Sequence, residues 1–246
     1  GVMDKLGAKE GEVIQHPLIT RSIEKAQKRV EMHNFDIRKH LLEYDDVMNQ
    51  QREVVYNRRR HALMGKNLKG EILQIIDEII ENSVYEFTDP KTYPEEWDLE
   101  GLKEKMAKIM LLKLDIPPDK IPYLKQEELI EDIKKKAHAL YERKEEVIGS
   151  ELMRKLERLA SLKVIDERWK EHLYEMDQLK EGIGLRAYGQ KDPLIEYKRE
   201  GYNMFVDMIN RTNEEIVDLI FKAQISEEAP PARRMPQEFV AQHESA

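Results

Sequence analysis

Three glycines in the stretch 182–189 are the first candidates for chemistry, because glycine-rich loops can hold phosphate groups. Gly182, Gly184 and Gly189 fit the spacing G-x-G-x4-G, whereas the dinucleotide fingerprint needs G-x-G-x-x-G after a strand. They follow a helical pattern, so we interpret Gly182 and Gly184 as residues that end a helix. The chain contains no GxxxxGK[ST] phosphate loop. We therefore expect no cofactor-binding residue and no ATP hydrolysis on this chain.

Histidines and clustered carboxylates are the next candidates, for metal binding and for acid–base catalysis. The seven histidines are scattered and form neither HExxH nor a Glu-x-x-His pair, so we expect no metal site. Glu43, Asp45 and Asp46 flank Tyr44, and paired acids can shift each other's pKa. On a helix these three point in different directions, which favours a solvated face or salt links to a docked neighbour. With no cysteine in the chain, thiolate chemistry and disulfides are excluded, and we expect no catalytic residue.

A basic run, Arg58 to Arg60 with Arg52 before it, leaves several interpretations open. It could be the solvated end of a helix, where cations are favourable near the carboxyl-terminal dipole. It could also contact an acidic domain or anionic lipid headgroups. The net charge of −8 argues against nonspecific nucleic-acid binding by the surface as a whole.

Residues 165–219 predict two amphipathic helices that form a hairpin. Steps of three and four place one stripe along each helix, and Asp192-Pro193 supplies an N-cap and a first-turn proline for the second. The first stripe comprises Ile165, Trp169, His172, Met176, Leu179 and Ile183, and the second Tyr197, Gly201, Phe205, Met208, Thr212, Ile216 and Leu219. A methionine-aromatic ligand box is the alternative, but helix–helix packing accounts for these residue types. We assign the hairpin core to Ile165, Trp169, Met176, Phe205 and Met208.

The tip of this hairpin carries more chemistry than a turn requires. It places a cation, an aromatic ring and an amide together at Leu185, Arg186, Tyr188, Gln190 and Lys191. A tyrosine offers an apolar ring and a hydroxyl with little side-chain entropy, so it can contact varied chains without reading their sequence. The alternative is a plain exposed loop. We predict a contact site at the tip.

The remaining elements are also expected to be helical, which gives an all-α fold. Charged residues make up 37% of the chain and aromatics 7%, a composition suited to long solvated helices. We predict one long helix over about 17–64, about 70 Å at 1.5 Å per residue. Three shorter helices over 68–87, 99–114 and 126–148 follow as a small inserted bundle, and Gly149-Ser150 leads into the hairpin. From Ser226 the sequence gains proline and loses period, which predicts a flexible C-terminal tail.

The chain resembles the SecA family, the ATPase motors of bacterial preprotein translocation. The resemblance is carried in order by HNFDIRKHLLEYDDVMNQQREVVYNRRR (33–60), YERKEEVIG (141–149) and IDERWKEHLYEMDQLKEGIGLRAYGQKDPLIEYKREGYNMFVDM (165–208). It covers about Met3 to Ile225, and the lead MDKLGAKEGE is similar to the exit of the family's second motor domain. Gly1 in place of methionine also predicts a fragment of a larger protein. The cysteine-rich zinc segment with which these proteins often end has no counterpart here, so any partner binding that depends on it is in doubt.

This resemblance implies a domain organisation in five parts. Residues 1–16 would be the exit of the preceding motor domain, 17–65 the long scaffold helix, 66–148 the three-helix wing, 149–225 the antiparallel two-helix finger, and 226–246 the flexible tail. ATP and Mg²⁺ would bind in motor domains outside this chain, so whether this part counts as an enzyme stays uncertain.

The resemblance also implies a mechanical function. Motion of the chain's own upstream motor domains would pass along the scaffold to the finger, whose tip would contact unfolded preprotein at the SecY channel complex. The location would be cytoplasmic, peripheral to the inner face of the plasma membrane, with anionic lipid as a further partner. A structural coiled-coil protein that dimerises through 17–64 without motor function is the alternative. His33 and Gln51 break its stripe, which favours packing against varied partners over a uniform zipper.

Overall fold

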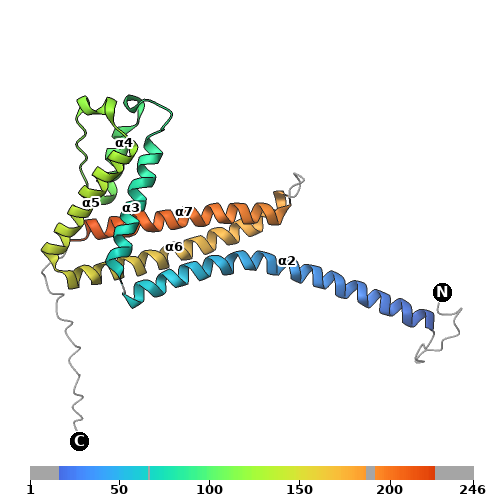
Figure 1. The fold of residues 1–246 in the computed structure, drawn as a ribbon. Coiled ribbons are helices and arrows are strands. Elements are labelled where there is room, and N and C mark those ends of the chain that lie inside the picture. The colour runs from blue at the N-terminus through green and yellow to red at the C-terminus, as the bar shows by residue number, and fades with distance from the viewer. Residues whose placement is uncertain (1–16, 66, 187–191, 225–246) are drawn as a thin grey trace, which may run out of the picture. The chain divides into compact units, whose positions relative to one another are not determined.

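The computed structural model describes residues 17–65, 67–186 and 192–224. In these residues the chain forms helices and no strand, which confirms the all-α prediction. The elements in order are α2 (Pro17–Met64), α3 (Leu68–Phe87), η1 (Pro94–Glu96), α4 (Leu99–Met110), η2 (Pro118–Tyr123), α5 (Gln126–Ile148), α6 (Ser150–Arg186) and α7 (Pro193–Lys222) (Figure 1). The tail predicted over 226–246 and the lead 1–16 lie outside the described residues.

The helices divide between two compact units. Residues 1–66 and 161–212 make up the first, which we call the hairpin unit, and residues 67–160 and 213–246 make up the second, the wing unit. The division falls within α6 and within α7, so each helix contributes residues to both units.

The wing unit is built on α3, which packs against both α4 and α5. Its core is apolar, and Ile76, Ile80, Leu102, Met106 and Ile133 are 0% exposed. The three predicted wing helices are confirmed, but α4 ends at Met110 and not at Leu114. Leu111 takes a left-handed conformation with φ 55 that stops the helix. Leu112 and Leu114 nevertheless stay buried outside the helix, so their apolar pattern reflects burial and not helix.

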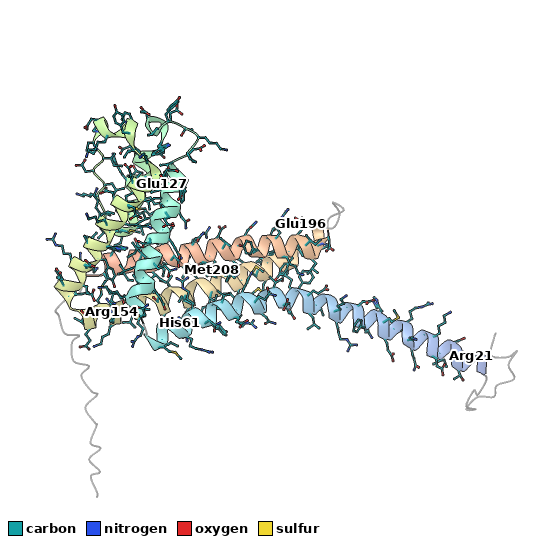
Figure 2. The ribbon with its side chains drawn as sticks, in the orientation of Figure 1. Arg21, His61, Glu127, Arg154, Glu196 and Met208 are labelled. Atoms are coloured by element: carbon teal, nitrogen blue, oxygen red, sulfur yellow. The ribbon has the colours of Figure 1, made fainter. Side chains whose placement is uncertain are left out.

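A buried polar network lies in the wing unit between α5 and the first turns of α6. Tyr141 donates a hydrogen bond to Glu157, which is 0% exposed. Arg154 Nη2 lies 3.0 Å from the Tyr141 hydroxyl, 2.8 Å from Glu145 Oε1 and 3.1 Å from Glu157 Oε1 (Arg154 is labelled in Figure 2). The hydrogen bond from Lys69 holds the pKa of Glu145 below its usual value, whereas burial raises the pKa of Glu157. Arg154 is the cation that contacts the buried carboxylate of Glu157 directly and compensates its charge.

The hairpin unit is made of α2, α6 and α7, and the second half of α2 lies beside the hairpin formed by α6 and α7 (Figure 1). The two predicted stripes are buried, and Ile165 is 3%, Trp169 7%, Met176 1% and Met208 7% exposed. Phe205 is only half-buried. The part of α2 that begins at Tyr44 packs on the hairpin, whereas residues 20–39 of α2 are exposed.

The prediction that Gly182 and Gly184 end the first hairpin helix is wrong. Both lie inside α6, which continues to Arg186. An interior glycine costs a helix about 1 kcal/mol relative to alanine, but Ile183 between them is 3% exposed and packs with Met176 and Tyr197. Burial of that side chain offsets the low helix propensity of its neighbours, so tertiary packing extends the helix.

Candidate functional site

The tip of the hairpin is the first part of the candidate site. Leu185 and Arg186, predicted as loop residues, belong to the last turn of α6. Tyr188, Gln190 and Lys191 lie outside the described residues. On the far side of the tip Asp192 caps α7 as predicted, because its Oδ1 accepts from the Leu194 amide at 2.9 Å.

A cluster near the tip joins both hairpin helices to α2. Met176 and Ile183 of α6 pack with Tyr197 of α7, and half-buried Tyr44, Val47, Met48, Leu179 and Met204 surround them. The rings of Tyr44 and Tyr197 lie 4.8 Å apart between centroids. Burial raises the pKa of Tyr197 to about 12, so this phenol stays neutral at physiological pH. The cluster is a largely apolar contact that joins α2, α6 and α7 close to the tip.

The carboxylates that drew attention in the sequence have structural partners on the surface. Lys180 Nζ of α6 lies 3.2 Å from Asp45 Oδ1 and 5.9 Å from the centroid of the Tyr44 ring. Asp46 accepts from Gln50 at 2.9 Å. Within the described ranges no group of three or more metal-ligating side chains could hold an ion. Asp45 therefore pairs with a cation of α6, whereas Asp46 accepts from a neutral amide on its own helix. The interpretation of salt links to a docked neighbour stays a prediction.

The basic run has a partner that the sequence did not indicate. Arg59 Nε lies 2.8 Å from Asp166 Oδ1 and its Nη2 lies 3.3 Å from Oδ2, which makes a bidentate ion pair between α2 and α6. Both side chains are about two-fifths exposed, at 40% and 43%, where solvent screens an ion pair and leaves it little stabilising effect. Arg59 therefore pairs with a carboxylate of α6 and is not a free cation at a helix end.

Midway along the unit, a polar node of three residues joins the three helices. We call Gln51 of α2, His172 of α6 and Gly201 of α7 the node. Gln51 Nε2 donates to the Gly201 carbonyl oxygen at 3.0 Å, and His172 Nε2 lies 2.8 Å from Gln51 Oε1. Because an amide oxygen only accepts, His172 must carry its proton on Nε2. The rings of Trp169 and Phe205 flank that imidazole, each at 5.7 Å.

The sequence signalled the node only in part. His172 and Gly201 fall on the two predicted stripes, and Gln51 is the polar break in the stripe of α2. Such a break is a signal for a buried polar contact, since a buried amide must find partners. Which residues it would meet could not be read from one helix, because the partners come from 121 and 150 residues away.

His172 is held neutral by its surroundings. It is 1% exposed, its Nδ1 has no hydrogen-bonding partner in the structure, and burial lowers its pKa to about 4. A histidine whose pKa falls on folding stabilises the protein above its unfolded pKa, near 6.5, and that stability is lost as pH falls toward the folded value.

We therefore expect a pH-dependent loss of stability that His172→Phe abolishes. From pH 7 to pH 4 the wild-type chain should lose on the order of 3 kcal/mol relative to the variant, about 1.36 kcal/mol for each unit of pKa shift. Urea unfolding of both chains across this range measures the difference. A difference that stays constant from pH 7 to pH 4 would contradict the buried neutral imidazole.

No helix in the described part of the chain combines the length and the apolar character needed to cross a membrane. This matches the charge-rich helix faces.

Comparison with known proteins agrees with this architecture. The family model described as the SecA wing and scaffold domain matches residues 13–224. The protein translocase subunit SecA of Pelotomaculum thermopropionicum is 48% identical over 225 residues, 92% of this chain and 25% of that protein. The protein translocase subunit SecA of Carboxydothermus hydrogenoformans is 47% identical over 235 residues, 96% of this chain and 27% of that protein. The chain thus spans about a quarter of the length of these curated relatives, and by its sequence and its helices it belongs to the SecA wing and scaffold family.

Proposed function

We propose that this chain is the scaffold, wing and finger part of a preprotein translocation motor. In this proposal, motor domains outside the chain bind ATP and Mg²⁺ and move the scaffold helix. The finger then pushes unfolded preprotein into the SecY channel complex, with the motor peripheral to the cytoplasmic face of the membrane and in contact with anionic lipid. The names of the relatives support this reading, since they are translocase subunits.

The observation that carries the proposal is the bonding of the hairpin to α2 over several turns. Contacts between α2 and the hairpin run from Tyr44–Tyr197 through Gln51–His172 to Arg59–Asp166. A helix in contact with its partner at three levels can transmit axial displacement to it, because the contacts join the two along their length. The hairpin would therefore move with α2 as one body.

A second observation supports a role within a larger assembly. Over its first half α2 carries exposed apolar side chains that the described residues leave uncovered: Ile23, Val30, Met32, Phe35, Ile37, Leu41 and Leu42, each between 47% and 68% exposed. Ile23, Val30, Ile37 and Leu41 form one row along the helix, and an exposed apolar row marks a protein–protein interaction site. We propose that the motor domains of the longer protein cover it. Self-association through the same row is the alternative, and sedimentation of the longer protein at several concentrations separates the two.

We expect the tip to matter for transport and not for stability. In the intact motor, Tyr188→Ala should reduce preprotein movement severalfold while basal ATP turnover stays nearly unchanged, and Tyr188→Phe should retain more activity than Ala. Because the sequence predicts an exposed turn at Tyr188, the free energy of unfolding should change by less than about 0.5 kcal/mol. Tyr174→Ala is the matched control, since Tyr174 lies on α6 and is 67% exposed. Normal transport by Tyr188→Ala would reduce the tip to a plain loop.

A further inference from the structure

The node lies in a contact surface that is otherwise mainly apolar. Gln51 is 7% exposed and His172 1%, so neither side chain can exchange its protein partner for bulk water. Both of the hydrogen bonds that link them to each other and to Gly201 cross between helices. The hydrogen bonds of the node therefore depend on direction, whereas the apolar packing around them does not.

The apolar contacts around the node repeat along α2. Tyr44 and Met48 pack on the hairpin cluster, and Val55 and Ala62 are buried further along the same helix. Met48, Val55 and Ala62 are spaced seven residues apart, as are Tyr44 and Gln51. A repeat of this kind offers similar packing at more than one axial position, because apolar attraction depends on area and not on direction. Packing alone thus discriminates weakly between neighbouring registers.

The polar contacts do discriminate. A slide of one seven-residue repeat, about 10.5 Å at 1.5 Å per residue, would carry the amide of Gln51 beyond hydrogen-bonding distance of both partners. It would leave the buried amide of Gln51 and the buried imidazole N–H of His172 without hydrogen-bonding partners, which costs free energy. Sliding an apolar contact carries no such cost. Fixing the register of helices in contact is the best-attested role of a single buried polar residue.

Gly201 makes this contact possible on the side of α7. A Cβ at this position would lie 2.8 Å from Met176 Cε and 3.9 Å from Gln51 Nε2. The missing side chain lets α7 approach α6 closely and exposes its carbonyl oxygen to Gln51. The geometry of α7 therefore admits the amide of Gln51 at this point of the helix.

We propose that the Gln51–His172–Gly201 node fixes the axial register of the finger hairpin on α2, and so the position along α2 at which α6 ends. The register follows from the contacts of the node alone. Its consequence for transport rests on the proposed function, which a transport defect in Tyr188→Ala tests separately. Gln51 and His172 are positioning residues that touch no substrate.

The test measures register directly in the complete 246-residue chain. Because the chain has no cysteine, Glu53→Cys on α2 and Glu181→Cys on α6 can carry two nitroxide labels at exposed sites. The distance between the two labels is measured by pulsed electron–electron double resonance. The node is replaced by Gln51→Met with His172→Phe, an apolar pair of similar shape that leaves no polar group unpaired. Circular dichroism and thermal melting check that each labelled chain is folded.

We expect one narrow distance distribution for the wild-type node. The double variant should add a second population displaced by up to about 10.5 Å, one seven-residue repeat. Each lost hydrogen bond is worth a factor of roughly two to ten in preference for one register. Should the double variant fail to fold, Gln51→Glu replaces it. That variant keeps an acceptor for His172 and loses the donor to Gly201, so a smaller displaced population is expected.

Asp166→Asn is the matched control, since it weakens the exposed Arg59–Asp166 pair between the same two helices. It should leave the distribution unchanged. An unaltered single distribution in the folded node variant would overturn the proposal. A displacement in Asp166→Asn as large as that in the node variant would overturn it too, because the surface pair would then set the register.

Discussion

Replacing Arg154 with methionine is expected to lower the free energy of unfolding by about 3–5 kcal/mol, the usual effect of removing one partner of a buried ion pair. Arg154 contacts Tyr141, Glu145 and Glu157, and the carboxylate of Glu157 is 0% exposed. Methionine preserves most of the volume and removes the charge. Urea unfolding followed by circular dichroism measures the loss.

The pH dependence of that loss identifies its cause. Burial already raises the pKa of Glu157, and removing Arg154 raises it further. A carboxyl whose pKa is higher in the folded state than in the unfolded one destabilises the protein at high pH and ceases to do so as pH falls below its unfolded pKa. The deficit of Arg154→Met should therefore be larger at pH 8 than at pH 5, and Glu157→Gln added to it should restore part of the stability.

The control for this prediction is the neighbouring residue. Lys155→Met removes a cation whose partner is Glu151, at 2.6 Å and with both side chains exposed at 60% and 84%. It should change stability by less than about 0.5 kcal/mol. If Arg154→Met and Lys155→Met were equally mild, the buried network would contribute nothing specific to the wing unit.

Trp169→Ala is expected to cost about 3–5 kcal/mol, as large-to-small substitutions of buried aromatic residues do. Trp169 is 7% exposed in the hairpin unit, and its ring lies 5.7 Å from that of His172. Tyr174→Ala on the same helix removes an aromatic side chain that is 67% exposed, so it should change stability by less than about 0.5 kcal/mol.

The two tryptophans of the chain allow this loss to be assigned. Trp97, the other one, lies in the wing unit and donates to the Asp89 carbonyl oxygen at 3.0 Å. In Trp169→Ala its fluorescence therefore reports unfolding of the wing unit alone, while circular dichroism reports both units. The circular dichroism transition should fall to lower urea, ahead of the fluorescence transition. Coincident transitions at the wild-type midpoint would show that Trp169 is not part of a packed core.

The sequence was sufficient for the elements whose cause is local. Pro17, Gly149 and Asp192-Pro193 mark helix ends that the structure reproduces, because proline geometry, glycine's positive φ and an N-cap side chain act within a few residues. The stripes of Trp169 and Met176 were predicted correctly because a period of 3.6 already specifies the buried face. Family membership followed from ordered blocks of residues that need no coordinates.

Only the tertiary structure decided where packing overrides local preference and where distant polar groups meet. Gly182 and Gly184 remain helical because Ile183 is buried, an effect that propensity alone does not contain. Gln51 was read as a break in a stripe, and it proved to be the centre of the node because its partners come from two other helices. Glu157 drew no attention in the sequence, since a carboxylate on a charged helix is usually solvated. Its burial depends on Arg154 and Tyr141, whose convergence on one point is a property of the folded chain.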